Sequence, residues 1–175
     1  MPTTLPPGYA LRSLREGEID RLAEIDRAGT HLLAEHGFPS LLDHTIDRAG
    51  MERLTAGRGV WVAAGPDDGA VGFAVASDPG PCLYLHELSV DPAHGRRGVG
   101  GALLAAVVAH ARWAFHSAVA LDTFRDVPFN APFYRKHGFV ALEPGLVPED
   151  IRGIVESERP PGIHPRCRTV MVRRL

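Results

Sequence analysis

The first third of the chain carries apolar residues at the spacing of an amphipathic helix. Between Glu16 and Glu35 they recur at positions that share one helical face, namely Ile19, Leu22, Ile25, Leu32 and Leu33. A short strand, Tyr9–Leu14, precedes this helix, and the run His36–Pro39 contains the glycine and proline that end it. The pattern then predicts a second helix over about Leu41–Leu54.

Short apolar runs bounded by turn residues follow and predict strands. The first two runs flank Gly65-Pro66-Asp67-Asp68-Gly69, a strong turn sequence, and so predict a hairpin. A longer apolar stretch from Val99 to about Phe115 predicts a helix between later strands. The expected strands are Gly59–Ala64, Ala70–Ala76, Leu83–Val90, Val119–Phe124 and Arg166–Arg174.

Strands on both sides of a central strand–loop–helix unit predict an α/β (α+β) fold, in which helices flank a mixed, mostly antiparallel sheet. The chain has 175 residues, which suits one domain that buries about 70% of the surface of its unfolded form. No repeat and no composition break divides it. We therefore expect a single domain over residues 1–175.

Composition excludes several classes of protein. Apolar residues make up 45% of the chain and charged residues 23%, values typical of a globular protein. No apolar run has the ~20 residues of a membrane span. The net charge of −2, with basic residues gathered only in one short turn, argues against a nucleic-acid partner.

Cysteine, histidine and the first residues bear on compartment and metal binding. Met1–Ala10 lacks the basic and apolar regions of a signal peptide, so a cytoplasmic location is expected. Cys82 and Cys167 stand far apart with no metal-binding spacing, which favours free thiols and no metal site.

The turn that follows the central strand has the features of a phosphate site. Arg96 and Arg97 stand before Gly98, and Gly100 and Gly101 open the predicted helix. A helix N-terminus offers unpaired N–H groups and partial positive charge, and glycines let an anion approach them. The sequence therefore predicts a pyrophosphate site.

Two nucleotide-binding motifs do not fit this turn. A Walker loop requires a lysine inside the loop, but the only lysine of the chain is Lys136. A Rossmann fingerprint requires a third glycine where Leu103 stands. The order Arg96-Arg97-Gly98-Val99-Gly100 instead resembles the acetyl-CoA loop of the Gcn5-related N-acetyltransferases (GNAT), Arg/Gln-x-x-Gly-x-Gly/Ala. Gly95 occupies the first position of that pattern, so one side-chain contact of the family is missing.

A second segment resembles the same family. The run Asn130-Ala-Pro-Phe133-Tyr134, followed by Gly138-Phe139, stands about 35 residues after the glycine turn, in the order that the family has. In that family the asparagine holds the pantetheine arm and the tyrosine lies near the thioester sulfur. The resemblance thus implies a GNAT-like acyl-CoA N-acyltransferase fold and acetyl-CoA as co-substrate.

The resemblance also implies which residues bind the co-substrate. The strand end is expected to present backbone groups to the thioester and the pantetheine, and the turn is expected to hold the pyrophosphate. The expected cofactor-binding residues are Leu88, Ser89, Val90, Arg96, Arg97, Gly98, Val99, Gly100, Gly101, Asn130 and Phe133.

Acetyl transfer to an amine needs a proton acceptor and a proton donor. Tyr134 can protonate the departing thiolate, and Glu87, in an otherwise apolar strand, is the candidate base. The alternative for Glu87 is an ion pair with an arginine. Period-two alternation predicts His86 on one face of the strand and Glu87 with Ser89 on the other.

The acceptor is expected to be a small amine that binds between the first helix, at His31 and Glu35, and an inserted loop, 140–165. Glu149–Glu158 of that loop is expected to form helical turns, and its acids outnumber its bases, so that it either recognises a cation or is a solvated decoration. A protein N-terminus or lysine as acceptor, a catalytically silent acyl-CoA-binding module, and a homodimer remain open alternatives. The acids are Glu143, Glu149, Asp150, Glu156 and Glu158.

Overall fold

A computed structural model describes residues 5–175, so Met1–Thr4, the start of the segment assessed for a signal peptide, lie outside the described residues. Its centre is a seven-stranded sheet in the order β1-β2-β3-β4-β5-β7-β6. Among these strands only β4 and β5 pair in parallel. The strands are β1 Ala10–Ser13, β2 Gly59–Ala64, β3 Ala70–Ser77, β4 Cys82–Val90, β5 Ala118–Phe124, β6 Val140–Ala141 and β7 Arg168–Arg174.

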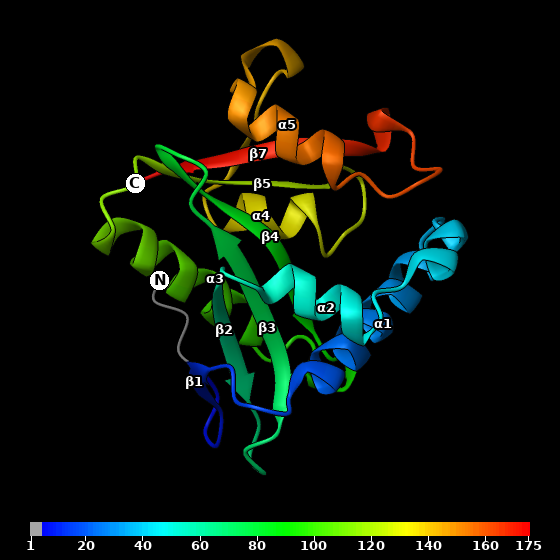
Figure 1. Cartoon of the computed structure of the whole chain (residues 1–175), viewed down its shortest axis with the longest axis vertical. Helices are drawn as coiled ribbons and strands as arrows, with labels where there is room; N and C mark the ends of the chain where they lie inside the picture. Colours follow the sequence, from blue (N-terminus) through cyan, green and yellow to red (C-terminus); the bar gives the residue numbers. More distant parts are fainter. Residues whose placement is uncertain (1–4) are drawn as a thin grey trace.

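Helices cover both faces of this sheet (Figure 1). Helices α1, α2 and α5 lie on one face, and α3 and α4 on the other. The α-helices are α1 Ile19–Glu35, α2 Arg48–Thr55, α3 Val99–Trp113, α4 Ala131–Lys136 and α5 Glu149–Ser157. Short 3-10 turns stand at Pro39–His44, Pro92–His94, Pro144–Leu146 and Pro165–Cys167. No helix within residues 5–175 combines the length and apolar character needed to cross a membrane.

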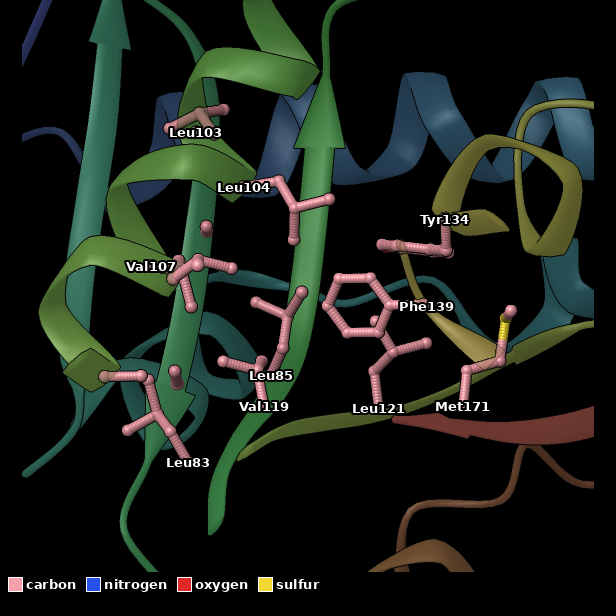
Figure 2. Close-up of a cluster of buried hydrophobic side chains, with 14 of the residues drawn as sticks. Leu83, Leu85, Leu103, Leu104, Val107, Val119, Leu121, Tyr134, Phe139 and Met171 are labelled. Atoms are coloured by element: carbon pink, nitrogen blue, oxygen red, sulfur yellow. The ribbon is translucent and has the colours of Figure 1, made fainter. Parts of the chain in front are cut away.

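Alternation along β3 explains the two layers. Phe73 and Val75 are fully buried against Leu22 and Ile25 of α1. Ala74 and Ala76 belong to the larger cluster on the other face, which contains α3 and the inward side of β4. Figure 2 shows part of this cluster, with Leu103, Leu104 and Val107 from α3, Leu83 and Leu85 from β4, and Phe139 packed between Leu85 and Tyr134.

Most of the predicted elements are confirmed, and three of the boundaries that differ have a local cause. The second predicted helix is broken, because Thr45 is extended (ψ 142°) and Asp47 caps a new helix by accepting a hydrogen bond from the Gly50 N–H. Helix α3 ends at Trp113, since Phe115 takes a left-handed conformation (φ 62°). Strand β7 starts at Arg168, after a 3-10 turn at Pro165–Cys167.

A β-bulge in β4 corrects the predicted alternation of His86 and Glu87. Val75 pairs with Glu87 while Ala76 pairs with Leu85, so His86 is the extra residue. His86 packs against Tyr84, which α5 covers, and Glu87 shares the α1 and α2 side of the sheet with its partner Val75. The two residues therefore lie on the same side, because the bulge shifts the period by one.

The same strand separates from β5 beyond the bulge. Strands β4 and β5 pair over Cys82–Leu85 and Ala118–Leu121, and no further pairing joins them within the described chain. In Figure 1, β5 and β7 accordingly run across the direction of β2 and β3. The gap exposes backbone N–H and C=O groups on one edge of β4, which is where we locate the site.

Candidate active site

A cavity of about 110 Å³ lies where β4 and β5 separate. Its walls come from α1, β4, β5, α4 and the first residue of β7, so it passes between the two layers through the gap in the sheet. The lining residues are Leu33, Leu85, His86, Glu87, Leu88, Leu121, Asp122, Thr123, Phe124, Asn130, Tyr134 and Arg168.

The glycine turn forms the N-terminus of α3, next to this cavity. Gly98 precedes the helix with a left-handed backbone (φ 85°), a conformation that glycine adopts at little cost. A Cβ on Gly100 would lie 3.6–3.7 Å from side chains of Leu88, Val90 and Phe133. These contacts bring together residues from three of the segments predicted to bind the co-substrate.

The two arginines of the turn take different positions. Arg97 donates to the Tyr9 hydroxyl (Nη1–Oη 3.3 Å) and to the Ala93 carbonyl (3.4 Å), and the Tyr9 hydroxyl is 2.8 Å from Nδ1 of His94. Arg96, also exposed, has a left-handed backbone (φ 56°). Arg97 thus links the turn to the N-terminal segment through Tyr9, and Arg96 is exposed at the rim of the turn, where an anion would approach.

Asn130 carries an unsatisfied buried acceptor at the cavity. Its amide nitrogen donates to the Thr123 hydroxyl at 3.0 Å, but its Oδ1 has no hydrogen-bond partner within residues 5–175, although it is shielded from solvent. A buried acceptor without a partner costs free energy until a donor reaches it. An amide N–H, such as each of the two in pantetheine, would satisfy it.

Tyr134 stands on α4 and lines the same cavity, where only 8% of the residue is exposed. Its ring packs edge-on against Phe139 at 5.7 Å between centroids, at the margin of the cluster in Figure 2. Burial raises the pKa of the phenol, and the nearby charge of Glu87 raises it further. The hydroxyl therefore keeps its proton at neutral pH.

Glu87 enters the cavity from β4. Burial raises the pKa of its carboxyl group, while hydrogen bonds from the Ser89 hydroxyl (2.9 Å) and the Leu88 N–H (3.1 Å) to Oε1 oppose that rise. The alternative prediction, an ion pair of Glu87 with an arginine, is not seen among the salt bridges of residues 5–175. Glu87 is thus a carboxyl group with a raised proton affinity beside Tyr134.

Asp26, which the sequence did not single out, is a second buried carboxyl group near Glu87. It lies on α1 with 7% exposure, one turn before Gly29, and a Cβ added to Gly29 would be 3.7 Å from the Ser89 hydroxyl. Burial and the charge of Glu87 raise the pKa of Asp26 to about 8. Only the tertiary contact of α1 with β4 creates this pair, so helical periodicity gave no signal for it.

His86 fixes the inserted segment to the bulge. Its Nε2 is 2.6 Å from the Ser77 hydroxyl, and its Nδ1 is 2.7 Å from Oε1 of Glu158, just after α5. Arg58, after α2, reaches the same carboxylate at 3.5 Å. Ile151 of α5 is almost completely buried in a cluster with Tyr84. The helix expected in the inserted loop thus exists. It packs against the sheet next to His86, which lines the cavity.

Arg168 and Asp122 form the opposite wall, and neither was predicted as a site residue. Nε of Arg168 donates to the Asp122 carboxylate at 2.7 Å, and Nη2 donates to the Asp122 carbonyl at 3.2 Å. Burial raises the pKa of Asp122, and the charge of Arg168 opposes this rise. An acid in the middle of an apolar strand was the one available signal for Asp122.

Two predicted acceptor residues do not reach the cavity. His31 and Glu35 are exposed on α1, and Leu33 lines the cavity in their place. Cys82 and Cys167 are free thiols, as expected. A larger open hollow of about 390 Å³ lies at the β2–β3 hairpin, lined by Arg21, Asp67 and His94 among others, away from Tyr134 and Glu87. Residues 5–175 contain no group of histidine, cysteine and acidic side chains that would hold a metal ion.

Comparison with solved structures supports this fold. A GCN5-related N-acetyltransferase from Rhodopseudomonas palustris superposes with a TM-score of 0.71 at 23% identity, covering 98% of each chain. A GNAT-family acetyltransferase from Staphylococcus aureus Mu50 gives 0.69 at 18%, covering 95% of this chain and 99% of its own. The PaiA N-acetyltransferase of Thermoplasma acidophilum, solved with coenzyme A, gives 0.68 at 15%, with the same coverage.

The family follows from a sequence match to the centre of the chain. Residues 56–141 match the model described as an acetyltransferase (GNAT) domain. This range contains the strand with Glu87, the glycine turn and the helix with Tyr134. Residues 56–141 are therefore a GNAT acetyltransferase domain, set in a fold that the solved GNAT structures share.

Proposed function

We propose that this acetyltransferase transfers the acetyl group of acetyl-CoA directly to the primary amine of a small molecule, within a ternary complex. The observation that carries the proposal is the shared cavity: Glu87 and Tyr134 enter it from β4 and α4, beside the unpaired acceptor of Asn130. A proton acceptor, a proton donor and a cofactor contact thus converge where the sheet opens.

Acetyl-CoA fits the residues that are present. The pyrophosphate would meet the N–H groups at the start of α3, with Arg96 at the rim. The pantetheine arm would lie along the open edge of β4, where an amide N–H can satisfy Oδ1 of Asn130. Support for this co-substrate also comes from the Thermoplasma acidophilum enzyme, which was solved with coenzyme A.

The reaction then needs two proton transfers. The amine attacks the thioester carbonyl, a C–N bond forms and the C–S bond breaks, while N–H groups in the Leu88–Val90 stretch stabilise the oxyanion. The Leu88 N–H would first have to leave Oε1 of Glu87, to which it donates in this structure. Glu87 accepts the amine proton directly or through water, and its raised pKa makes it a stronger base than an ordinary carboxylate. Tyr134, protonated at neutral pH, supplies the proton that the thiolate takes up.

The shape of the site favours a small acceptor over a protein chain. The cavity measures about 110 Å³, and Leu33 of α1 forms part of its wall. Helix α5 is fixed beside it through the contact of Glu158 with His86. His31 and Glu35 would meet an acceptor only outside this cavity. The chemistry requires no metal ion, and a cytoplasmic location and a homodimer stay predictions.

Replacing Tyr134 by phenylalanine tests the proposal. We expect kcat to fall by about 10²–10⁴-fold, the usual contribution of general acid catalysis, with an unchanged dissociation constant for CoA. Tyr84→Phe is the matched control, since Tyr84 is a buried tyrosine of the neighbouring cluster that does not line the cavity. Full turnover of Tyr134→Phe would assign Tyr134 to packing.

A further inference from the structure

The guanidinium of Arg168 is held in a fixed position on the wall of the cavity that faces Glu87. Arg168 begins β7 and pairs with Phe124 of β5, and its guanidinium carbon lies 4.5 Å from the centroid of that ring. The Asp122 carboxylate accepts a hydrogen bond from Nε of Arg168 at 2.7 Å, and the Asp122 carbonyl accepts one from Nη2 at 3.2 Å. The side chain is only 17% exposed. Ring and carboxylate together therefore set the plane of the guanidinium.

This geometry leaves donors unused. A guanidinium has five N–H donors, and Asp122 occupies one on Nε and one on Nη2. No hydrogen bond within residues 5–175 uses Nη1 of Arg168, although this residue lines the cavity. The ion pair and the carbonyl hydrogen bond with Asp122 account for one edge of the guanidinium, so the other edge is available to a ligand.

Opposite charges thus face each other across the gap in the sheet. Glu87 stands on the β4 wall, with Asp26 behind it on α1, and Arg168 stands on the β5–β7 wall. The cavity that separates the walls is only about 110 Å³, the size of a small molecule. A ligand that spans it would place a cationic group at Glu87 and an anionic group at Arg168.

We propose that the acceptor is an amino acid or a related small aminocarboxylate, whose amine meets Glu87 and whose carboxylate accepts hydrogen bonds from Arg168. The planar guanidinium matches a carboxylate better than any neutral group, because charge-assisted N–H···O bonds are the stronger ones. A diamine would bring its second cation to Arg168 and be repelled. This inference rests on the proposed function, which supplies the position of the amine.

Matched acceptors test the proposal on the wild-type protein. For each amino acid of a panel, acetylation is compared with that of its carboxamide and of the amine that lacks the carboxyl group, by release of CoA. We expect kcat/KM for at least one amino acid to exceed that of both analogues by about 10- to 100-fold, the effect of a charge-assisted hydrogen bond. Equal rates for the three members of every set would overturn the proposal.

Substitution of Arg168 assigns the selectivity to this residue. Arg168→Gln should raise KM for the amino acid about 10- to 100-fold more than it raises KM for the two analogues, which abolishes the preference. Arg168→Lys should recover part of it. Arg166→Gln is the control, because Arg166 is exposed just before β7 and does not line the cavity. A preference that survives in Arg168→Gln would overturn the role of Arg168.

The outcomes separate this inference from the function on which it rests. Amines that react without regard to a carboxyl group would overturn the inference and leave acetyl transfer intact. If neither amino acids nor amines react while CoA still binds, the proposed function fails. Because Arg168→Gln leaves Asp122 without its partner, a double variant with Asp122→Asn keeps the pair neutral, and its melting temperature reports folding.

Discussion

Single carboxyl groups in the cleft make the activity depend on pH. Glu87 can accept a proton only when ionised, and its pKa is raised by burial, so turnover should rise with pH through that raised pKa. Glu87→Gln should lower kcat by about 10²-fold or more and remove this part of the pH–rate profile, with CoA binding intact. Glu156→Gln, at an exposed position of α5, is the control. An unchanged profile in Glu87→Gln would make Glu87 structural.

Asp26 should make stability fall as pH rises. Its pKa is about 8 in the folded protein against 3.8 ordinarily, so the folded state holds a proton that the unfolded state releases. The stabilisation is complete below the unfolded pKa and is lost as pH rises through the folded pKa, at up to about 1.4 kcal/mol per pH unit. The melting temperature of Asp26→Asn, measured relative to that of the wild type, should therefore increase as the pH is raised from 5 to 8.

The control for this measurement is Glu35→Gln, at the exposed end of the same helix. A difference in melting temperature between Asp26→Asn and wild type that stays constant across this pH range would show that Asp26 is ionised in the folded protein. In a Glu87→Gln background, the pKa of Asp26 should be lower than in the wild type, because the charge of Glu87 contributes to raising it. The dependence of stability on pH should then be smaller.

The residues that sequence could identify share one property: each lies within a local motif. Asn130 and Tyr134 stand in one short run, and Glu87 is conspicuous because it interrupts an apolar strand. Asp26 and Arg168 become site residues only when α1 and β7 meet β4 and β5. Their sequence surroundings resemble those of any surface acid or arginine, so only the tertiary structure identifies them.

At the scale of elements, sequence located the strands and helices but missed the device that shapes the cleft. The bulge at His86 has no proline or glycine to mark it, and a perfect alternation would place His86 and Glu87 on opposite faces. The break between the 3-10 turn and α2 was missed for a similar reason. It depends on the Asp47 side chain, which caps α2 in the middle of the segment predicted as one helix.

The turn before α3 should be the element most sensitive to substitution for CoA binding. Gly98→Val should raise KM for acetyl-CoA at least about tenfold, because a side chain would occupy the path of the anion and the left-handed backbone would be strained. Gly57→Val controls for strain, since Gly57 is also left-handed (φ 69°) and has open space around it. Unchanged CoA affinity in a folded Gly98→Val protein would rule out this turn as the pyrophosphate site.

At the scale of the whole molecule, the gap between β4 and β5 separates two halves of one sheet. Strands β1–β4 form one half, and β5, β7 and β6 form the other. Residues Cys82–Leu85 and Ala118–Leu121 make the pairing that joins them, and the apolar cluster around α3 adds contacts to both. A pantetheine arm in the gap would touch β4 on one side and Asn130, after β5, on the other.

Coenzyme A should therefore protect both halves from hydrogen exchange. At a concentration of 100 times Kd, it should stabilise the protein by about 2.7 kcal/mol. Amides of 86–90 and of 130–134 should exchange more slowly, together with those of the turn at 96–101. Adenosine diphosphate, which carries the pyrophosphate without pantetheine, should protect the turn alone. If CoA protects only the turn, the arm does not lie between the strands, and the positions assigned to Tyr134 and Glu87 relative to the thioester would be wrong.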